Sequence, residues 1–330
     1  MRMTIRPYLH IFEQNGFSEM IKVDLITGFL GSGKTTFLLK YARYLMNQGQ
    51  RIGILVYDYG ALNIDMVLLS KLRGPKCELE MVAAACDDDC LVRRFKTKLI
   101  AMAMSGYDRV IIEPSGVFDM DMFFDELRDE PLEKWYEIGS VITVVDANLS
   151  KDSHRLSKEE DFILASEAAF AGCILLSKVQ LSDDRAIEAT KLHLIEAADR
   201  IKCRGFKPVY LAKDWQELTD EDYEYISRAG YHMADYVKSY AGSSMAYSSV
   251  SFLDIKYDLD VFLDKVRSLF ANLSYGHIVR VKGFVLGGQT NYEINATESS
   301  LNVTESSIGQ NVAIVIGKEL NEDKIKELLG

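Results

Sequence analysis

The part of the chain with the clearest chemistry is a glycine-rich stretch at residues 28–36, which reads GFLGSGKTT. It matches the pattern G-x-x-x-x-G-K-[ST], in which glycines let consecutive backbone amides point at phosphate oxygens. In this pattern the lysine, here Lys34, reaches the β- and γ-phosphates, and the hydroxyl that follows, here Thr35, binds Mg²⁺. A nucleoside triphosphate with Mg²⁺ is therefore the predicted ligand. The predicted contacts come from Gly28, Gly31, Ser32, Gly33, Lys34, Thr35 and Thr36.

A second part of the same site is predicted at residues 113–116, which read EPSG. They follow the apolar segment 108–113, and in a parallel sheet the carboxyl ends of the strands line the ligand crevice. Glu113 is expected to hold Mg²⁺ or its water shell, and the amide of Gly116 to contact the γ-phosphate. These two residues join Lys34 and Thr35 as the predicted catalytic group. An ordinary strand-ending turn is the alternative.

The elements that must position these residues alternate between apolar strands and helices. Near-continuous apolar strands separated by helices are typical of a parallel sheet covered on both faces, so the first part is predicted to be α/β. A polar segment at 236–249 is predicted to be a linker before a smaller α+β domain with a largely antiparallel sheet. Strands are expected at 22–27, 51–57, 108–113, 140–146 and 171–177, then at 249–256, 278–286, 292–296, 301–304 and 313–316, with helices at 35–48, 91–104, 260–269 and from 321 onward.

Length and composition limit the function classes. The 330 residues carry 38 basic and 49 acidic side chains, a net charge of −11, so phosphate backbones are repelled and no nucleic-acid partner is expected. No apolar run is long enough for a membrane span, and residues 1–19 lack the pattern of a signal peptide. They are predicted to be an N-terminal appendage, with Met20 as an alternative start. Five cysteines favour a reducing compartment, and the cytoplasm is the expected location.

Five motifs together resemble the CobW family of P-loop GTPases, relatives of the nickel-insertion GTPases of urease and hydrogenase. They are GFLGSGKTT, the E-x-x-G loop at 113–116, VITVVDA at 141–147, RVKGF at 280–284 and AIVIGKEL at 313–320. The resemblance covers residues 20–330. It implies a P-loop nucleotide-binding domain at 20–235, with a mostly parallel sheet flanked by helices, and a CobW-type C-terminal α+β domain at 250–330.

The resemblance also implies an activity. Such proteins couple the binding and slow hydrolysis of GTP, with Mg²⁺, to the delivery or insertion of a metal or a corrinoid cofactor. The implied partner is a client metalloprotein or a corrinoid-dependent protein, and a homodimer is one assembly to consider. Residues 57–60 (YDYG) and 64–65 (ID) fall where the family has N-E-F-G and a following I-D. Asp58 is then expected near Mg²⁺, in place of the family's glutamate.

Residues 86–90 (CDDDC) depart from the C-x-C-C metal motif of the family. Two thiolates with carboxylates still suit Zn²⁺ or another divalent transition metal. The predicted transition-metal ligands are Cys86, Asp88, Asp89 and Cys90. An acidic surface loop with two incidental thiols is the alternative. Thr35, Asp58 and Glu113 are the separate set predicted for Mg²⁺.

The base-recognition motif departs as well, because residues 177–180 read SKVQ where such GTPases have N-K-x-D. Ser177, Lys178 and Gln180 are still expected to line the base site. The amide of Gln180 cannot replace the charged, two-oxygen acceptor that an aspartate offers to guanine. GTP is the first expectation, with ATP left open. Two rival functions remain: an ATP-dependent kinase or ligase acting on a small molecule, and a regulatory scaffold that holds nucleotide without turnover.

Overall fold

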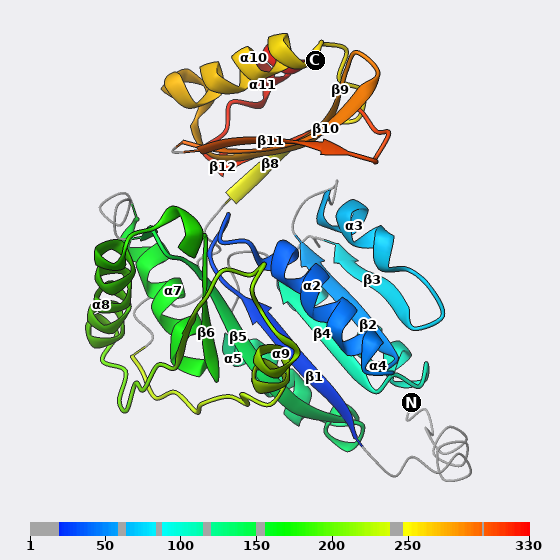
Figure 1. Cartoon of the computed structure of the whole chain (residues 1–330), viewed down its shortest axis with the longest axis vertical. Coiled ribbons are helices and arrows are strands. Elements are labelled where there is room, and N and C mark those ends of the chain that lie inside the picture. The colour runs from blue at the N-terminus through cyan, green and yellow to red at the C-terminus, as the bar shows by residue number, and fades with distance from the viewer. Residues whose placement is uncertain are drawn as a thin grey trace.

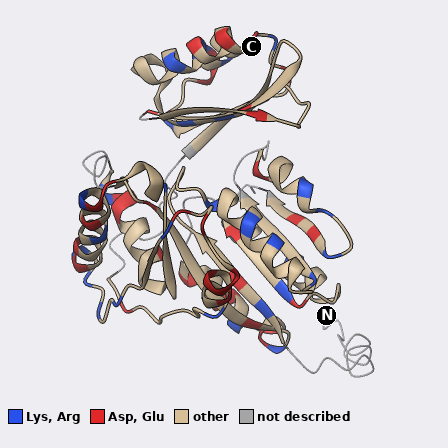
Figure 2. Cartoon of the chain, in the orientation of Figure 1, with Lys and Arg blue, Asp and Glu red and all other residues tan. Residues whose placement is uncertain are grey.

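The computed structural model describes residues 20–58, 64–83, 88–114, 120–149, 156–237, 247–298 and 300–330. The larger part has a twisted sheet with helices on both faces, and the smaller part has a second sheet with its helices on the far side (Figure 1). Within the described residues, no helix is both long and apolar enough to cross a bilayer. On α8 (Asp184–Arg200) acidic and basic side chains are interspersed (Figure 2), and Lys191 pairs with Glu188 at 2.7 Å.

The larger sheet is entirely parallel, as the apolar strand pattern predicted. Its order is β3-β2-β4-β1-β5-β6-β7, so β1 lies in the middle of the sheet. Two edge strands, β3 and β7, were not expected from the sequence, because β3 alternates charged with apolar residues and β7 has only three residues. The strands are β1 (Ile21–Thr27), β2 (Ile52–Asp58), β3 (Cys77–Ala83), β4 (Arg109–Pro114), β5 (Tyr136–Asp146), β6 (Cys173–Ser177) and β7 (Tyr210–Ala212).

Helices bury apolar side chains on both faces of this sheet, which explains why its central strands are apolar throughout. On one face, Phe37 and Tyr41 of α2 are fully buried. On the other face, Phe95 of α4 and Phe123 of α5 are fully buried. The helices are α2 (Lys34–Asn47), α3 (Ile64–Leu69), α4 (Asp88–Ala103), α5 (Met120–Arg128), α7 (Lys158–Phe170), α8 and α9 (Asp220–Ser227).

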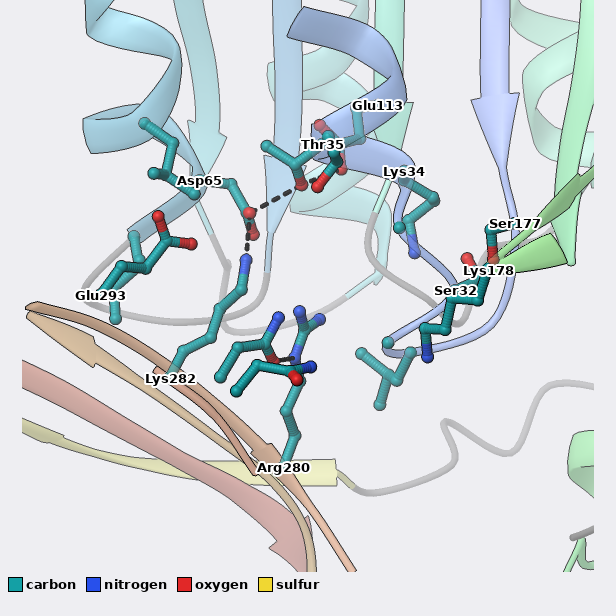
Figure 3. A pocket seen from close by; sticks show the side chains of 18 of the residues that line it. Ser32, Lys34, Thr35, Asp65, Glu113, Ser177, Lys178, Arg280, Lys282 and Glu293 are labelled. Atoms are coloured by element: carbon teal, nitrogen blue, oxygen red, sulfur yellow. Dashed lines mark hydrogen bonds and ion pairs between the residues drawn. The ribbon is translucent and has the colours of Figure 1, made fainter. Parts of the chain in front are cut away.

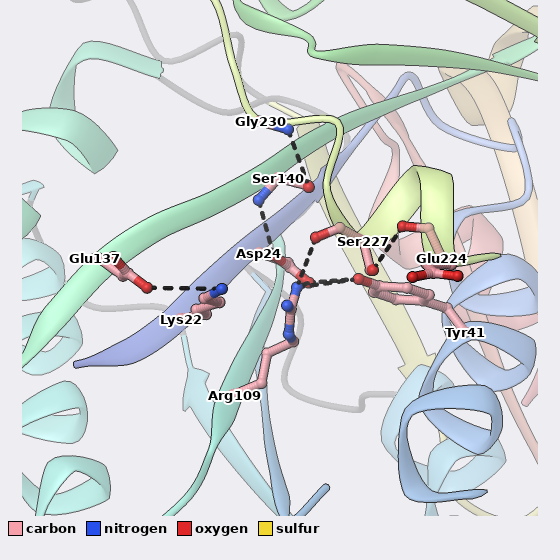
Figure 4. A network of polar contacts seen from close by, with 9 residues as sticks. All are labelled: Lys22, Asp24, Tyr41, Arg109, Glu137, Ser140, Glu224, Ser227 and Gly230. Carbon is pink, nitrogen blue, oxygen red and sulfur yellow. Dashed lines mark hydrogen bonds and ion pairs between the residues drawn. The ribbon is translucent and has the colours of Figure 1, made fainter. Parts of the chain in front are cut away.

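One buried polar network lies inside the sheet, centred on the middle of β1 (Figure 4). Asp24 is fully buried in β1 and forms an ion pair with Arg109 of β4 at 2.5 Å. Tyr41 donates to the same carboxylate at 2.7 Å, and the amide of Ser140 donates to its second oxygen at 2.8 Å. Since a buried charge must be paired and hydrogen-bonded to be tolerated, this network ties β1, β4, β5 and α2 together.

The smaller part has an antiparallel sheet in the order β11-β10-β9-β12-β8, as the sequence predicted. Its helices cover one face, where Phe262 and Val266 pack against Val281 and Val285 of β9. Residues 247–249, expected in the linker, belong to β8, and residues 238–246 lie outside the described part. The elements are β8 (Tyr247–Phe252), α10 (Leu259–Ala271), β9 (His277–Gly287), β10 (Thr290–Thr297), β11 (Ser300–Ser306), β12 (Val312–Lys318) and α11 (Glu322–Leu329).

The other face of the antiparallel sheet is turned toward the nucleotide-binding part. Phe284, fully buried on β9, belongs to one apolar cluster with Ile64 and Leu68 of α3. Among the residues that the structure describes, two ion pairs join the parts: Lys282 with Asp65, and Lys318 with Glu160 at 3.0 Å. The smaller sheet therefore forms a roof over the carboxyl ends of the parallel strands.

Candidate functional site

A cavity of about 340 Å³ lies between the two parts, at the carboxyl ends of β1, β2, β4 and β6. The glycine-rich loop and the start of α2 form its floor. Gly33, just before α2, has a φ of 105°, a left-handed conformation that favours glycine. The loop residues that line the cavity are Leu30, Gly31, Ser32, Gly33, Lys34, Thr35 and Thr36.

Lys34 is buried in the floor, and its ammonium donates to the carbonyl oxygen of Gly28 at 2.6 Å. Burial lowers the pKa of Lys34, and the carboxylates of Glu113 and Glu167 partly oppose that shift. The ammonium also donates to the carbonyl oxygen of Phe29 at 3.5 Å. A buried ammonium held by neutral carbonyl oxygens is stabilised when an anion binds beside it. The first residues of α2 add the positive potential of a helix N-terminus at the same place.

Three oxygens converge beside Lys34. The Oγ1 of Thr35 lies 2.7 Å from Asp65 Oδ1 and 2.7 Å from Glu113 Oε1. A hydroxyl has one hydrogen, so it can donate to only one of two ionised carboxylates at a time. Glu113 Oε2 is buried and has no hydrogen-bond partner. A hydroxyl and two carboxylates, one of which has an oxygen without a partner, fit the all-oxygen donor set of Mg²⁺. The Mg²⁺ roles of Thr35 and Glu113 stay predictions.

The two carboxylates differ in their protonation. Burial and the negative charge of Asp65 raise the pKa of Glu113 to about 7. Burial acts to raise the pKa of Asp65 too, but the charges of Lys282 and Arg280 outweigh it and hold that pKa well below its usual range. Glu113 therefore readily keeps a proton in the absence of a cation, whereas Asp65 is ionised.

The predicted base-binding residues lie at the opposite end of the cavity. Ser177, Lys178 and Gln180 all line it, beside a loop that follows β7. Lys178 has a φ of 55° and pairs with Asp146 at the end of β5. Ser177 is buried, and its hydroxyl oxygen has no hydrogen-bond partner, as is also true of Ser32 in the loop. These two orphaned hydroxyls suit a polar ligand.

Trp215 closes this end of the cavity. Its indole Nε1 donates to the carbonyl oxygen of Leu176 at 3.1 Å, and its ring meets Gly33, where a Cβ would approach within 3.1 Å. Asp214 and Gln216 line the cavity on either side of it. This loop follows β7, a strand that the sequence reading missed, so its contribution to the site was missed as well.

The roof of the cavity is polar (Figure 3). Alternation along β9 turns Arg280 and Lys282 toward the cavity, while Val281 packs into the core beneath α10. Glu293 and Asn295 line it from the neighbouring strand β10. In the sequence, the R-V-K-G-F motif supported the family resemblance but carried no predicted role. Period-two alternation on β9 was the signal that could have identified these two cations.

Glu167 is a further buried residue that the sequence reading did not identify. It lies on α7 below the glycine-rich loop, is fully buried, and burial raises its pKa to about 8. Neither carboxylate oxygen has a hydrogen-bond partner of good geometry, although Lys34 and the amide of Gly28 are close enough to favour its ionised form.

Several predicted site residues lie outside the part of the chain that the structure describes. Gly116 falls in 115–119, and Cys86 falls in 84–87. The structure gives the backbone but not the side chains of Asp58 at the end of β2 and of Asp88 and Asp89 at the start of α4. Cys90 lies half-buried on α4. Of the four residues predicted to bind a transition metal, the structure therefore describes the side chain of Cys90.

Fold and site together define a P-loop nucleotide-binding protein with a roofing C-terminal domain. Residues 22–203 match the family model for the CobW/HypB/UreG nucleotide-binding domain. This match covers more than half of the 330 residues, and the chain belongs to the CobW/HypB/UreG family. The resemblance drawn from the five motifs is thereby confirmed.

Two curated relatives carry names that mention zinc. Zinc chaperone YjiA of Escherichia coli (strain K12) is 32% identical over 200 residues, which are 58% of this chain and 57% of that protein. Zinc-regulated GTPase metalloprotein activator 1 of Dictyostelium discoideum is 24% identical over 326 residues, which are 86% of this chain and 64% of that protein. The chain therefore spans less than two thirds of the length of these relatives.

Among solved structures, the crystal structure of Zn(II)-bound YjiA GTPase from E. coli is 18% identical to this chain. The alignment covers 94% of this chain and 98% of that one, with a TM-score of 0.38. A TM-score this low leaves the fold to be read from the sheet order and the family match.

Proposed function

We propose that this protein binds GTP with Mg²⁺ and hydrolyses it slowly, and that the nucleotide state controls delivery of a metal ion to a client metalloprotein. The main support for nucleotide binding is that four side chains converge at one end of the cavity beneath the C-terminal sheet. They are Lys34, Thr35, Asp65 and Glu113. The family match and the names of the relatives support GTP rather than ATP as the nucleotide.

The side chains divide the work in this proposal. Lys34 and the loop amides bind and orient the β- and γ-phosphates, because consecutive N–H groups and an ammonium neutralise their charge. Thr35, Asp65 and Glu113 would hold Mg²⁺, which would supply charge neutralisation for the phosphates. Glu113 must give up its proton to do so, since its pKa of about 7 keeps it partly neutral beforehand. The roof residues exclude water from the reacting end.

Substitution of the floor residues tests nucleotide binding. Lys34→Ala and Thr35→Ala are expected to abolish measurable GTP binding in calorimetry, because they remove the phosphate ammonium and a Mg²⁺ ligand. Arg43→Ala is the matched control, since Arg43 lies exposed on the same helix. Unchanged GTP affinity in either floor variant would refute this assignment of the site.

The metal cargo is proposed to be Zn²⁺, on the strength of two thiols at residues 86 and 90 and the names of the relatives. Those names favour a metal over a corrinoid. Zn²⁺ titration of the wild type against the Cys86→Ser/Cys90→Ser double variant, with and without GTP, tests this. We expect the variant to lose one equivalent of bound Zn²⁺.

Cys203→Ser provides the control for this titration, because Cys203 is a half-buried free thiol outside the CDDDC segment. It should keep the stoichiometry of the wild type. Identical stoichiometry and affinity in the double variant and the wild type would remove residues 86–90 from the metal proposal while leaving the nucleotide proposal intact.

A further inference from the structure

Arg280 carries a guanidinium from the C-terminal sheet into the wall of the nucleotide cavity. Its Nε donates to Asn295 Oδ1 of the neighbouring strand at 3.1 Å. This bond fixes the plane of the guanidinium and places the two terminal nitrogens at its outer end. Figure 3 shows that end directed away from β9, into the space between Asp65 and Lys34.

Arg280 lies between two residues of the proposed nucleotide site. Lys34, Asp65 and Arg280 all line the same cavity. Lys34 is the predicted contact of the β- and γ-phosphates, and Asp65 belongs to the Mg²⁺ donor set. The position between them is therefore where the transferred phosphoryl group of a bound triphosphate would lie.

Arg280 differs in its chemistry from the lysines that line the same cavity. Lys282 is paired with Asp65, and Lys178 with Asp146 near the base end. Among the described residues that line the cavity, Arg280 is the one arginine. Its planar fork matches two oxygens of a phosphoryl group, which a lysine ammonium does not.

We propose that Arg280 is an arginine finger that the C-terminal domain supplies to the nucleotide site of its own chain. This inference rests on the proposed GTP hydrolysis. In that reaction a water oxygen forms a bond to the γ-phosphorus, and the bond from this phosphorus to the β–γ bridging oxygen breaks. GDP leaves with the bonding electron pair, and the protons of the water pass to inorganic phosphate and solvent. Arg280 donates to the γ-oxygens and the bridging oxygen as their charge develops.

Single-turnover hydrolysis of GTP tests the role of Arg280. Arg280→Ala is expected to lower the rate about 1,000-fold, the lower end for loss of an arginine finger, while GDP affinity changes little. Arg280→Lys should recover only part of the rate, because it keeps the charge without the fork. Arg267→Ala is the matched control, since Arg267 is exposed on α10 and pairs only locally with Asp264.

A second measurement separates a finger from a structural role. GDP with Mg²⁺ and aluminium fluoride imitates the planar phosphoryl group, and its tight complex should form with the wild type and with Arg267→Ala but not with Arg280→Ala. Thermal unfolding midpoints establish that each variant is folded. If Arg280→Ala does not fold, Arg280→Lys takes its place in both measurements.

The outcomes are distinct. A hydrolysis rate for Arg280→Ala equal to that of the wild type, or a parallel loss of GDP and GTP affinity, would overturn the proposed finger. Absence of hydrolysis in the wild type would instead overturn the proposed GTPase function. In that case, formation of the aluminium fluoride complex by the wild type and Arg267→Ala, but not by Arg280→Ala, would still assign Arg280 to the transferred group.

Discussion

At the scale of single residues, Gln180 limits how the proposed base site can recognise guanine. It lines the cavity, and in the sequence it stands where the N-K-x-D motif has the aspartate that accepts from guanine N1 and N2. A neutral amide offers one acceptor oxygen, and its NH₂ group meets the guanine donors with another donor.

Gln180→Asp is therefore expected to raise the preference for GTP over ATP by roughly 10- to 100-fold, which corresponds to a charge-assisted bond of about 1–3 kcal/mol. Competition binding of the two nucleotides measures this. Gln216→Asp is the control, because it adds a carboxylate to the same cavity at a different place. Equal shifts in both variants would mean that added charge alone, and not its position, is responsible.

The buried carboxyl group of Glu167 predicts how the stability of the protein depends on pH. Burial raises its folded-state pKa to about 8, whereas an ordinary glutamate titrates near 4.3 in the unfolded chain. Between these values the folded state keeps a proton that the unfolded state has lost. Stability from this group is thus greatest below the unfolded pKa and declines as the pH rises toward 8, by at most about 1.4 kcal/mol per pH unit.

Glu167→Gln should abolish this decline, so that the variant gains stability relative to the wild type as the pH rises from 5 to 8. Urea unfolding of the nucleotide-free protein across this range measures the difference. Glu221→Gln, on the exposed first turn of α9, should follow the wild type. A constant difference between Glu167→Gln and the wild type would contradict the raised pKa.

At the scale of elements, the loop between β1 and α2 depends on a close approach to β5. Gly28 has a φ of 136°, and a Cβ there would lie 2.2 Å from the carbonyl oxygen of Val144. The same glycine offers its own carbonyl to Lys34. Strand β5 therefore supports the loop from behind, and no larger residue fits without moving the loop.

Gly28→Ala is expected to lower GTP affinity at least tenfold, about 1.4 kcal/mol, because the displaced loop no longer presents its amides together. Gly205→Ala is a close control: Gly205 also has a positive φ, of 74°, but nothing lies within 4 Å of its added Cβ. Both variants place an alanine at a positive φ, so calorimetry shows what the clash at Gly28 adds. Equal affinities in the two variants would argue against the loop displacement.

At the scale of the whole molecule, the C-terminal domain and a bound cation are predicted to compete for Asp65. Lys282 is largely buried and pairs with Asp65, whose carboxylate belongs to the proposed Mg²⁺ donor set. Lys318 makes the other ion pair between the domains, with Glu160, away from that donor set. Domain contact and cation binding are thus linked through one residue of α3.

Lys282→Met should change two measurements in opposite directions. Stability without nucleotide should fall, because Asp65 is left as a partly buried charge without its partner. Mg²⁺ affinity in the presence of GDP should rise, because the competing ammonium is gone. Lys318→Met should lower stability without raising Mg²⁺ affinity. An unchanged or weaker Mg²⁺ affinity in Lys282→Met would contradict the competition.

The sequence by itself determined the alternation of buried strands and helices, the phosphate loop and the family. These features follow from local pattern. The spacing of Gly28, Gly33 and Lys34 identifies the loop, and runs of apolar residues identify the strands, without any knowledge of contacts between distant segments. Glu113 was also predictable, because the end of a parallel strand has a fixed relation to the crevice.

Only the tertiary structure decided which distant residues complete the site. Asp65 meets Thr35 across 30 positions of the chain, and Arg280 enters the cavity because one face of an antiparallel sheet is turned toward another domain. Glu167 becomes a titrating group only through burial, which depends on what packs above it. Such distances and pKa values depend on how separate elements pack against one another. The spacing of residues along the sequence does not specify that packing.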